Sequence, residues 1–153
     1  MKNKLGLEGF IQVALVVENI EQVAKKWSEI FGIPTPEIEI HGPSEDQTLL
    51  YHGELADYKI KFAAIEVPNK GVVIELTEPI EGKSTFKDFF DKHGQGVHHL
   101  GFEVGDRRDA IVGELEKEKG YDLRTVGYYP GSSWTIVDTE EALGVNLNIK
   151  PMA

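Results

Sequence analysis

The stretch GVHHLGFEV, residues 96–104, has the alternation of side chains that is typical of a β-strand. In a regular strand His99 points to one face of the sheet and His98 to the other, toward the helix layer. The turn-forming segment HGQG precedes this strand, and VGDRRDAI follows it, with Asp106 at a position that favours a helix N-cap. A histidine at the start of such a strand faces either a core or a cavity, so these two side chains determine which chemistry is open to the protein.

The same pattern occurs earlier in the chain. The segment QVALVVENIEQVA begins at Gln12 and matches HLGFEVGDRRDAI, which begins at His99, at an offset of 87 (99 − 12). The segment GVVIEL matches GVNLNI, and this places Glu75 opposite Asn148 at an offset of 73 (148 − 75). We therefore predict two copies of a strand–helix–strands unit, each of which opens and closes with one inward-facing polar residue.

The bulk composition restricts the class of protein. The chain has 153 residues, of which 41% are hydrophobic and 27% charged, as expected for one soluble domain with its own core. It has no cysteine, which excludes disulfides and thiolate ligands and fits a cytoplasmic location. No apolar run has the length of a membrane span, and the N-terminus lacks the apolar stretch of a secretory signal. The net charge is −10 without a basic run, so we expect a small-molecule ligand and neither nucleic acid nor membrane as a partner.

The predicted elements follow the same order in both copies. In the first copy Asn19 caps a helix that ends at Gly32, and Ser84 caps a short helix that joins the copies. The expected strands cover residues 10–17, 37–41, 48–51 with 58–66, 72–76, 99–104, 123–128, 134–138 and 145–149, and the second helix covers residues 106–119. This order predicts an α+β fold of two tandem βαβββ modules, in which a strongly curved mixed sheet carries helices on its convex side. We expect one domain over residues 1–153, with module one at about 10–80 and module two at about 97–150, and a pocket on the concave side.

The doubled pattern, with IELTEPIEG and FFDKHGQGVHHLGFEV, resembles the vicinal oxygen chelate superfamily over about residues 10–150. This superfamily includes glyoxalase I, methylmalonyl-CoA epimerase, extradiol dioxygenases and bleomycin-resistance proteins, and the resemblance is closest to the epimerase-like and glyoxalase-like branch. It implies a homodimer and a divalent metal on the concave face. Carried over to this sequence, the metal ligands would be Gln12, Glu75, His99 and Asn148. Gln12 replaces the usual histidine and Asn148 the usual glutamate.

These replacements leave two interpretations of the four positions open. A divalent metal could still bind through one imidazole and one carboxylate with help from two amide oxygens, although the charge of the ligands falls from about −2 to −1. Alternatively, the four side chains form a hydrogen-bonded polar cluster in a pocket, because buried polar groups need partners that these residue types supply.

The resemblance implies proton transfer beside a carbonyl group, which needs a base and a group that stabilises the enolate. Glu75 is the first candidate for the base and His99 the second. Without a metal, Lys61 or Arg124 could stabilise the negative charge. Asn148 cannot abstract a proton, which argues against a standard two-base methylmalonyl-CoA epimerase. We therefore predict a glyoxalase- or epimerase-like lyase or isomerase that acts on a small 2-oxo or acyl substrate.

The segment TVGYYPGSSW combines aromatic residues with glycine and serine, as the edge of a ligand pocket often does, although an ordinary turn with an inward tryptophan explains it equally well. The predicted substrate-binding residues are Tyr128, Tyr129, Ser132, Ser133, Trp134, His52 and Lys61. The alternative function is that of a metal-free protein that binds a cationic drug, as bleomycin-resistance proteins do. The acidic charge, the aromatic segment and the replaced ligands favour this alternative.

Overall fold

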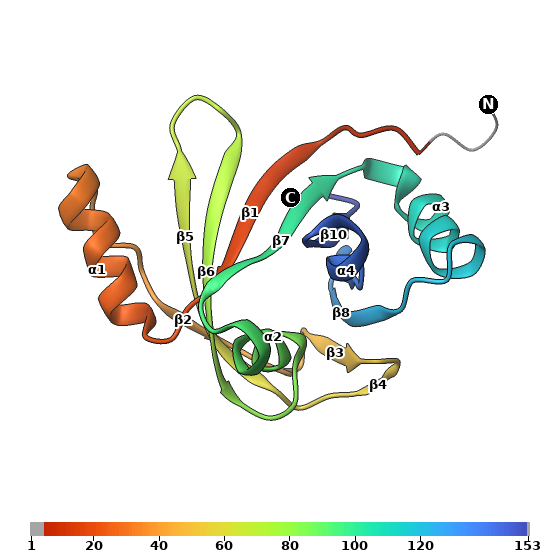
Figure 1. Ribbon diagram of the computed structural model, residues 1–153, viewed down its shortest axis with the longest axis horizontal. Helices are drawn as coiled ribbons and strands as arrows, with labels where there is room; N and C mark the ends of the chain where they lie inside the picture. The colour runs from red at the N-terminus through yellow and green to blue at the C-terminus, as the bar shows by residue number, and fades with distance from the viewer. Residues whose placement is uncertain (1–4, 153) are drawn as a thin grey trace.

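The computed structural model describes residues 5–152, and the strands of this part of the chain form one continuous sheet (Figure 1). The strands are β1 (Phe10–Val16), β2 (Glu39–His41), β3 (Thr48–Tyr51), β4 (Glu54–Leu55), β5 (Lys59–Val67), β6 (Val72–Glu81), β7 (Gly96–Glu103), β8 (Leu123–Tyr129), β9 (Ser132–Val137) and β10 (Asn146–Lys150). The helices are α1 (Ile20–Phe31), α2 (Thr85–His93), α3 (Arg108–Gly113) and α4 (Glu140–Leu143). None of the helices within residues 5–152 has the length and apolar character needed to cross a membrane.

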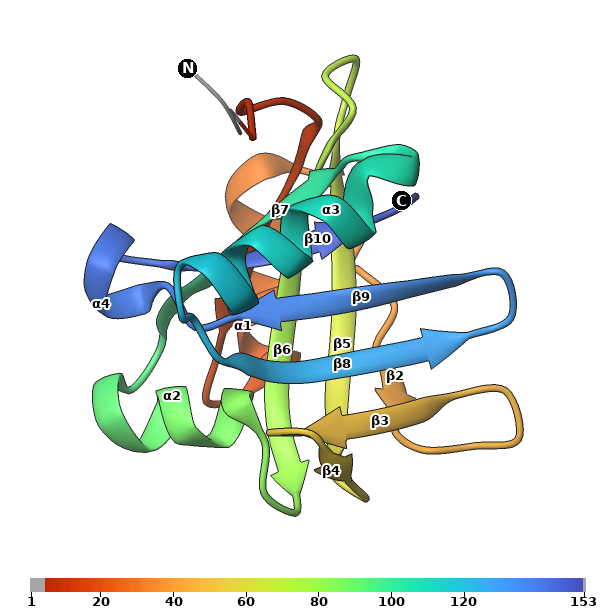
Figure 2. The ribbon, with the colours of Figure 1, turned by 90° about the vertical axis from the view of Figure 1, so that its right-hand side faces the viewer.

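The strand order shows the predicted duplication. The sheet runs β2-β5-β6-β1-β7-β10-β9-β8-β3-β4, so in each copy the first strand lies beside the last one. β1 is parallel to β6, β7 is parallel to β10, and the two first strands pair antiparallel at the centre. The sheet curls strongly, and in projection β8 and β9 cross β5 and β6 steeply (Figure 2). The prediction of an α+β fold of paired βαβββ modules in a strongly curved mixed sheet is confirmed.

The strand β3 belongs to the first copy in sequence but pairs with the second copy in the sheet. The sequence predicted residues 48–51 as part of the middle segment of module one, but β3 pairs with β8 of the second copy instead. The chain turns back at His52 and Gly53, both of which have positive φ, and this turn folds β4 onto β3. The hairpin therefore extends the second half of the sheet and brings Leu49 to the concave side.

The helices α1 and α3 cover the outside of the curl, as their apolar spacing predicted (Figure 1). Ile20 and Ala24 of α1 pack against β5 and β6, while Ile111 and Leu115 pack with residues of β7, β9 and β10. α2 lies at one end of the curl, and its Phe86 belongs to the core of the concave side. A set of residues shares that core with it: Val16, Leu49, Tyr58, Ile60 and Phe89.

The two outer helices begin differently. The side chain of Asn19 accepts a hydrogen bond from the backbone of Gln22, so the predicted cap of α1 is confirmed. The prediction that Asp106 caps the second helix is wrong. Gly105 has a φ of +63° and opens a 3₁₀ turn, Gly105–Arg107, so that Asp106 lies inside this turn and α3 has no side-chain cap. A π-helical turn, Glu114–Glu118, continues the helix.

A bulge in β7 breaks the alternation that the sequence predicted. Ala14 of β1 lies opposite His99 and Leu15 lies opposite Val97, so His98 has no partner in β1. His98 and His99 are consequently both buried. The prediction that their rings point apart is wrong, because their Nδ1 atoms lie 2.8 Å from one another.

Candidate active site

A cavity of about 420 Å³ lies on the concave side, with walls from both halves of the sheet. Its polar lining includes Glu75, Thr77, His99, Asn148, Lys150, His41 and Asp46. Its apolar lining includes Leu49, Ile60, Phe62, Phe86 and Trp134. This size and this mixture of apolar walls with a few convergent polar groups are typical of small-molecule sites.

Gln12 lies in the wall below the cavity and connects its polar groups. Its side-chain nitrogen lies 2.6 Å from Glu75 Oε1 and 2.8 Å from His99 Nε2. Its oxygen accepts a hydrogen bond from the Lys150 ammonium at 3.2 Å. The amide therefore has a partner for each of its two hydrogens and for its oxygen, and only 2% of the residue is exposed.

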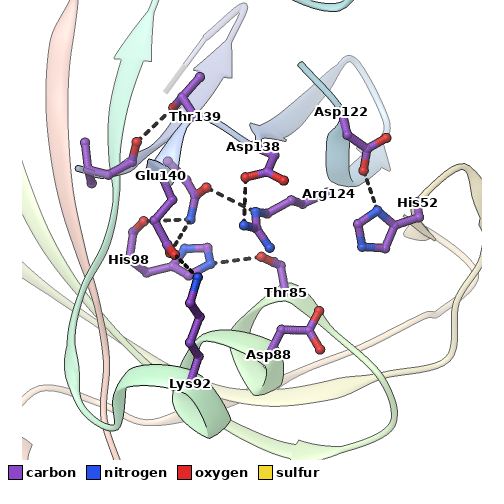
Figure 3. Close-up of polar contacts among 12 residues, drawn as sticks. His52, Thr85, Asp88, Lys92, His98, Asp122, Arg124, Asp138, Thr139 and Glu140 are labelled. Atoms are coloured by element: carbon purple, nitrogen blue, oxygen red, sulfur yellow. Dashed lines mark hydrogen bonds and ion pairs between the residues drawn. The ribbon is translucent and has the colours of Figure 1, made fainter. Parts of the chain in front are cut away.

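This arrangement fixes the protons of the two histidines. The amide nitrogen of Gln12 can only donate, so His99 Nε2 accepts and the proton of neutral His99 lies on Nδ1. That proton is donated to His98 Nδ1 at 2.8 Å, and His98 then donates from Nε2 to Thr85 Oγ1 at 3.0 Å (Figure 3). A continuous chain of hydrogen bonds thus runs from Glu75 through Gln12, His99 and His98 to α2.

The electrostatics agree with neutral rings. Burial and, to a smaller extent, the nearby Arg124 lower the pKa of His98 to about 3, while Glu140 opposes the shift. Burial also places the pKa of His99 well below its usual value, with His98 and Lys150 acting in the same direction. Burial raises the pKa of the Glu75 carboxyl, and the neighbouring Lys150 and, to a smaller extent, His41 act in the opposite direction.

Two glycines make room for the side chains of the site. Gln12 and Asn148 lie opposite Gly101 from its two sides, and a Cβ at Gly101 would come within 2.6 Å of Gln12 Oε1. On the neighbouring pair of strands, the Trp134 indole lies over Gly127, where a Cβ would come within 2.2 Å of the ring. The bare backbone at these two positions lets Gln12 reach across β7 and lets Trp134 lie flat on the cavity wall.

The structure brings some of the predicted residues together. Glu75, His99 and Asn148 line the cavity, and Gln12 lies directly beneath them in contact with the first two. From the aromatic segment, Tyr129 and Trp134 are on the cavity wall. The internal repeat therefore located three polar residues of the cavity wall and the glutamine beneath them, whereas their roles stay predictions.

The other predicted residues lie elsewhere, since none of them is found on the cavity wall in the described part of the chain. Tyr128 is exposed, while Ser132 and Ser133 are half-buried or buried on β9. The ring of His52 contacts Asp122 (Figure 3), and Lys61 forms an ion pair of 2.6 Å with Glu21 of the outer helix α1.

The positive group of the cavity is Lys150, which the sequence reasoning missed. Arg124, one of the two predicted cations, is bound to Asp138 and Asn146 (Figure 3). Lys150 follows Asn148 by two residues on β10, so both side chains point to the same face. The spacing of two residues from Asn148 could therefore have identified Lys150 as a cavity residue from the sequence.

The comparisons with known proteins agree with this architecture. The profile of the Glyoxalase/Bleomycin resistance protein/Dioxygenase superfamily matches residues 11–137, and the chain belongs to this superfamily. No match is found among curated proteins.

Several solved structures share the fold. Methylmalonyl-CoA epimerase from Mycobacterium tuberculosis is 21% identical with a TM-score of 0.63, covering 98% of this chain and 93% of its own. A variant of the Streptomyces coelicolor methylmalonyl-CoA epimerase in complex with 2-nitronate-propionyl-CoA is 19% identical with a TM-score of 0.62, covering 97% and 99%. The hypothetical protein BH1468 from Bacillus halodurans C-125 is 19% identical with a TM-score of 0.58, covering 92% and 91%. At these identities the likeness establishes the fold and leaves the reaction open.

A divalent metal, which the resemblance implies, does not fit the side chains as they lie. The remaining lone pair of His99 accepts from Gln12, the oxygen of Gln12 faces the Lys150 ammonium, and Asn148 Oδ1 accepts from the backbone of Thr135 at 3.2 Å. Within residues 5–152 no group of three or more His, Cys, Asp or Glu side chains could hold a metal ion. A metal here would have to reverse the Gln12 amide and lie close to the ammonium.

Proposed function

We propose that this protein is an enzyme that moves a proton at the carbon next to a carbonyl group, as a glyoxalase- or epimerase-like isomerase or lyase does. The observation that supports it is the position of the Glu75 carboxyl. One of its oxygens is held by Gln12, while for Oε2 no hydrogen bond is found among residues 5–152, and the residue lies on the cavity wall. A carboxylate with one anchored and one available oxygen is suited to act as a positioned base.

The environment of Glu75 also matches this task. Burial raises its pKa toward the neutral range in which a general acid–base group works best. In the proposed step Glu75 takes the proton from the carbon, and the electron pair of the broken C–H bond forms a carbon–carbon double bond as the carbonyl oxygen becomes an enolate. Return of the proton to the same carbon regenerates the substrate, so an isomerisation requires a substrate whose proton-bearing carbon also carries a hydroxyl group. Glu75 then delivers the proton to the former carbonyl carbon, and the hydroxyl-bearing carbon becomes the new carbonyl as its hydroxyl proton is lost.

The second predicted proton acceptor has another role in this proposal. The only lone pair on the ring of His99 is engaged by Gln12, and burial keeps its pKa low. We infer that His99 accepts the second hydrogen of the Gln12 amide and so helps to hold Gln12 in place against Glu75. Asn148 opposite cannot take a proton, so proton transfer from one face of the substrate is favoured over two-base epimerisation.

The cavity favours a small substrate with a 2-oxo or acyl group and an apolar part. Its volume of about 420 Å³ and its phenylalanine and tryptophan walls suit such a molecule. The alternative of a cationic ligand has less support, because Lys150 and His41 lie on the same walls. A positive ligand would be repelled by this ammonium, which shares the cavity with the carboxylates of Glu75 and Asp46.

The test is hydrogen exchange in deuterium oxide, followed by NMR on a panel of 2-oxo acids, their thiol adducts and acyl thioesters, including methylmalonyl-CoA. We expect at least one of them to exchange its α-proton, and we expect Glu75→Gln to lower the rate by about 100- to 10,000-fold, the usual contribution of general acid–base catalysis. Glu81→Gln, at the exposed end of the same strand, is the matched control and should leave the rate unchanged. Absence of exchange for every member of the panel, or an undiminished rate in Glu75→Gln, would contradict the proposal.

A further inference from the structure

Lys150 is the lysine of the cavity wall, and neither the repeat nor the resemblance gave it a role. It extends from β10 on the same face as Asn148 and lies on the cavity wall with Glu75 and His99. Six lysines of the described residues form ion pairs with carboxylates, whereas none is found for Lys150 or for the surface lysines Lys70, Lys83, Lys117 and Lys119. Its one side-chain hydrogen bond found there is the contact with Gln12 Oε1 at 3.2 Å.

This contact decides the orientation of the Gln12 amide. In the reverse orientation the amide oxygen would face Glu75 Oε1 across 2.6 Å, so that two acceptors would meet, and the NH₂ group would face the ammonium. The ammonium and the carboxylate therefore select the same orientation. That orientation directs the amide hydrogens to Glu75 Oε1 and His99 Nε2, so these two atoms and the Gln12 oxygen are engaged, and Glu75 Oε2 is the one atom of this set left for a metal ion.

The ammonium has hydrogens to spare for a ligand. A lysine carries three N–H groups, of which Gln12 accepts one, and the half-buried side chain lies on the wall of the cavity. A hydrogen bond from an ammonium to an oxyanion is charge-assisted and strengthens where water is excluded. An oxygen that becomes negative during the reaction is the group that such a donor stabilises most.

We propose that Lys150 supplies the positive charge of this site, binding the carbonyl oxygen of the substrate and its enolate form, so that the protein works without a divalent metal. The ligand class is a planar oxyanion joined to an apolar group, such as an enolate. This inference rests on the proposed function for the reaction, but the binding of the oxyanion by Lys150 can be measured without any turnover.

The nitronate of phenylnitromethane is a suitable probe. Its planar, negatively charged nitronate group copies an enolate, it lacks a proton that Glu75 could remove, and its ring suits the apolar walls. Calorimetry at mildly alkaline pH should show that the wild-type protein binds this nitronate. Lys150→Met should weaken the affinity by about 10- to 100-fold, the loss expected for a hydrogen bond to a charged group, and Lys150→Arg should restore most of it.

Lys61→Met is the matched control, because it removes a lysine from the outer face of the sheet and should leave the affinity unchanged. Should Lys150→Met fail to fold, Lys150→Gln removes the charge and keeps a polar side chain. Equal affinities of the wild type and the uncharged variant, or no binding of the nitronate to the wild type, would overturn the proposal.

Metal independence has its own test. Titration of the chelator-treated wild-type protein with Co²⁺, followed through the absorption bands of the bound ion, should show no stoichiometric binding. Uptake of one Co²⁺ per chain that is lost in Glu75→Gln would overturn the proposal. The two proposals can fail separately. If the protein binds the nitronate through Lys150 but exchanges no proton, only the proposed reaction is contradicted. If Lys150→Met still exchanges the proton at the wild-type rate, only the role of the lysine is contradicted.

Discussion

The two halves of the molecule place equivalent side chains at one site but use them differently. The last strand of the first half contributes Glu75, a carboxyl with a raised pKa, whereas the last strand of the second contributes Asn148, whose oxygen is engaged by the Thr135 backbone. The first strands contribute Gln12, a double donor, and His99, an acceptor. The duplicated backbone thus fixes the positions, while the chemistry depends on which residue type stands at each of them.

The largest effect is expected for a histidine that only the second half contains. At the repeat offset of 87, His98 corresponds to Ile11 of the first half (98 − 87 = 11). Burial keeps His98 neutral with a folded-state pKa of about 3, against 6.5 for an exposed histidine. Between these values the unfolded chain binds more protons than the folded one, so the free energy of unfolding falls as the pH drops from 6.5 toward 3.

This single histidine accounts for a loss of several kcal/mol, at most about 5 kcal/mol at the acid end of that range. Denaturant unfolding at a series of pH values gives the slope of the free energy of unfolding against pH, which measures the number of protons taken up on unfolding. In His98→Gln this number should be smaller than in the wild type by up to about one. Arg124, Glu140 and His99 lie around the ring and stay in place in both proteins. His52→Gln removes a partly exposed ring that contacts Asp122, away from His98, and serves as a control. A wild-type slope in His98→Gln would contradict the assignment.

A smaller effect is expected from a pair of glycines in the second half. Gly101→Ala places a Cβ within 2.8 Å of three atoms of Gln12, so the side chain that links the halves must move. We expect a loss of about 1–3 kcal/mol in the free energy of unfolding, together with a lower rate of proton transfer. Gly113→Ala is the matched control, because this glycine lies in α3 with no atom within 4 Å of an added Cβ. There alanine should stabilise the fold by about 0.5–1 kcal/mol, and equal effects at both positions would disprove the crowding at Gly101.

The smallest change in the free energy of unfolding is expected at the N-termini of the two outer helices, α1 and α3. Asn19→Ala removes the hydrogen bond to the Gln22 backbone and should cost about 1 kcal/mol. Asp106→Ala should cost less than about 0.5 kcal/mol, because Asp106 makes no capping bond. Thermal unfolding of both variants gives the comparison, and a greater loss for Asp106→Ala would show that this residue stabilises α3 in another way.

The sequence predicted the parts of the fold that follow from local pattern. Alternating strands, the Asn19 cap and the internal repeat are local features, and together they specified the paired modules and the set of Gln12, Glu75, His99 and Asn148. The predicted homodimer and cytoplasmic location stay predictions.

The rest depends on contacts between distant segments. The bulge at His98 arises from the register with β1, and the place of β3 arises from its pairing with β8. Whether Lys61 faces the cavity depends on which sheet face β5 turns inward, and its partner Glu21 on α1 lies on the other face of the sheet from the cavity. Pattern within a single strand does not contain that information.

Because the Trp134 indole lies against Gly127, the residue type at position 127 determines how much of the cavity the indole occupies. Any larger residue there would tilt the indole inward and exclude bulky substrates while leaving Glu75 and Lys150 untouched. On the proposed function, the range of substrates would therefore depend on a backbone position that does not line the cavity, and libraries that vary residue 127 test this dependence.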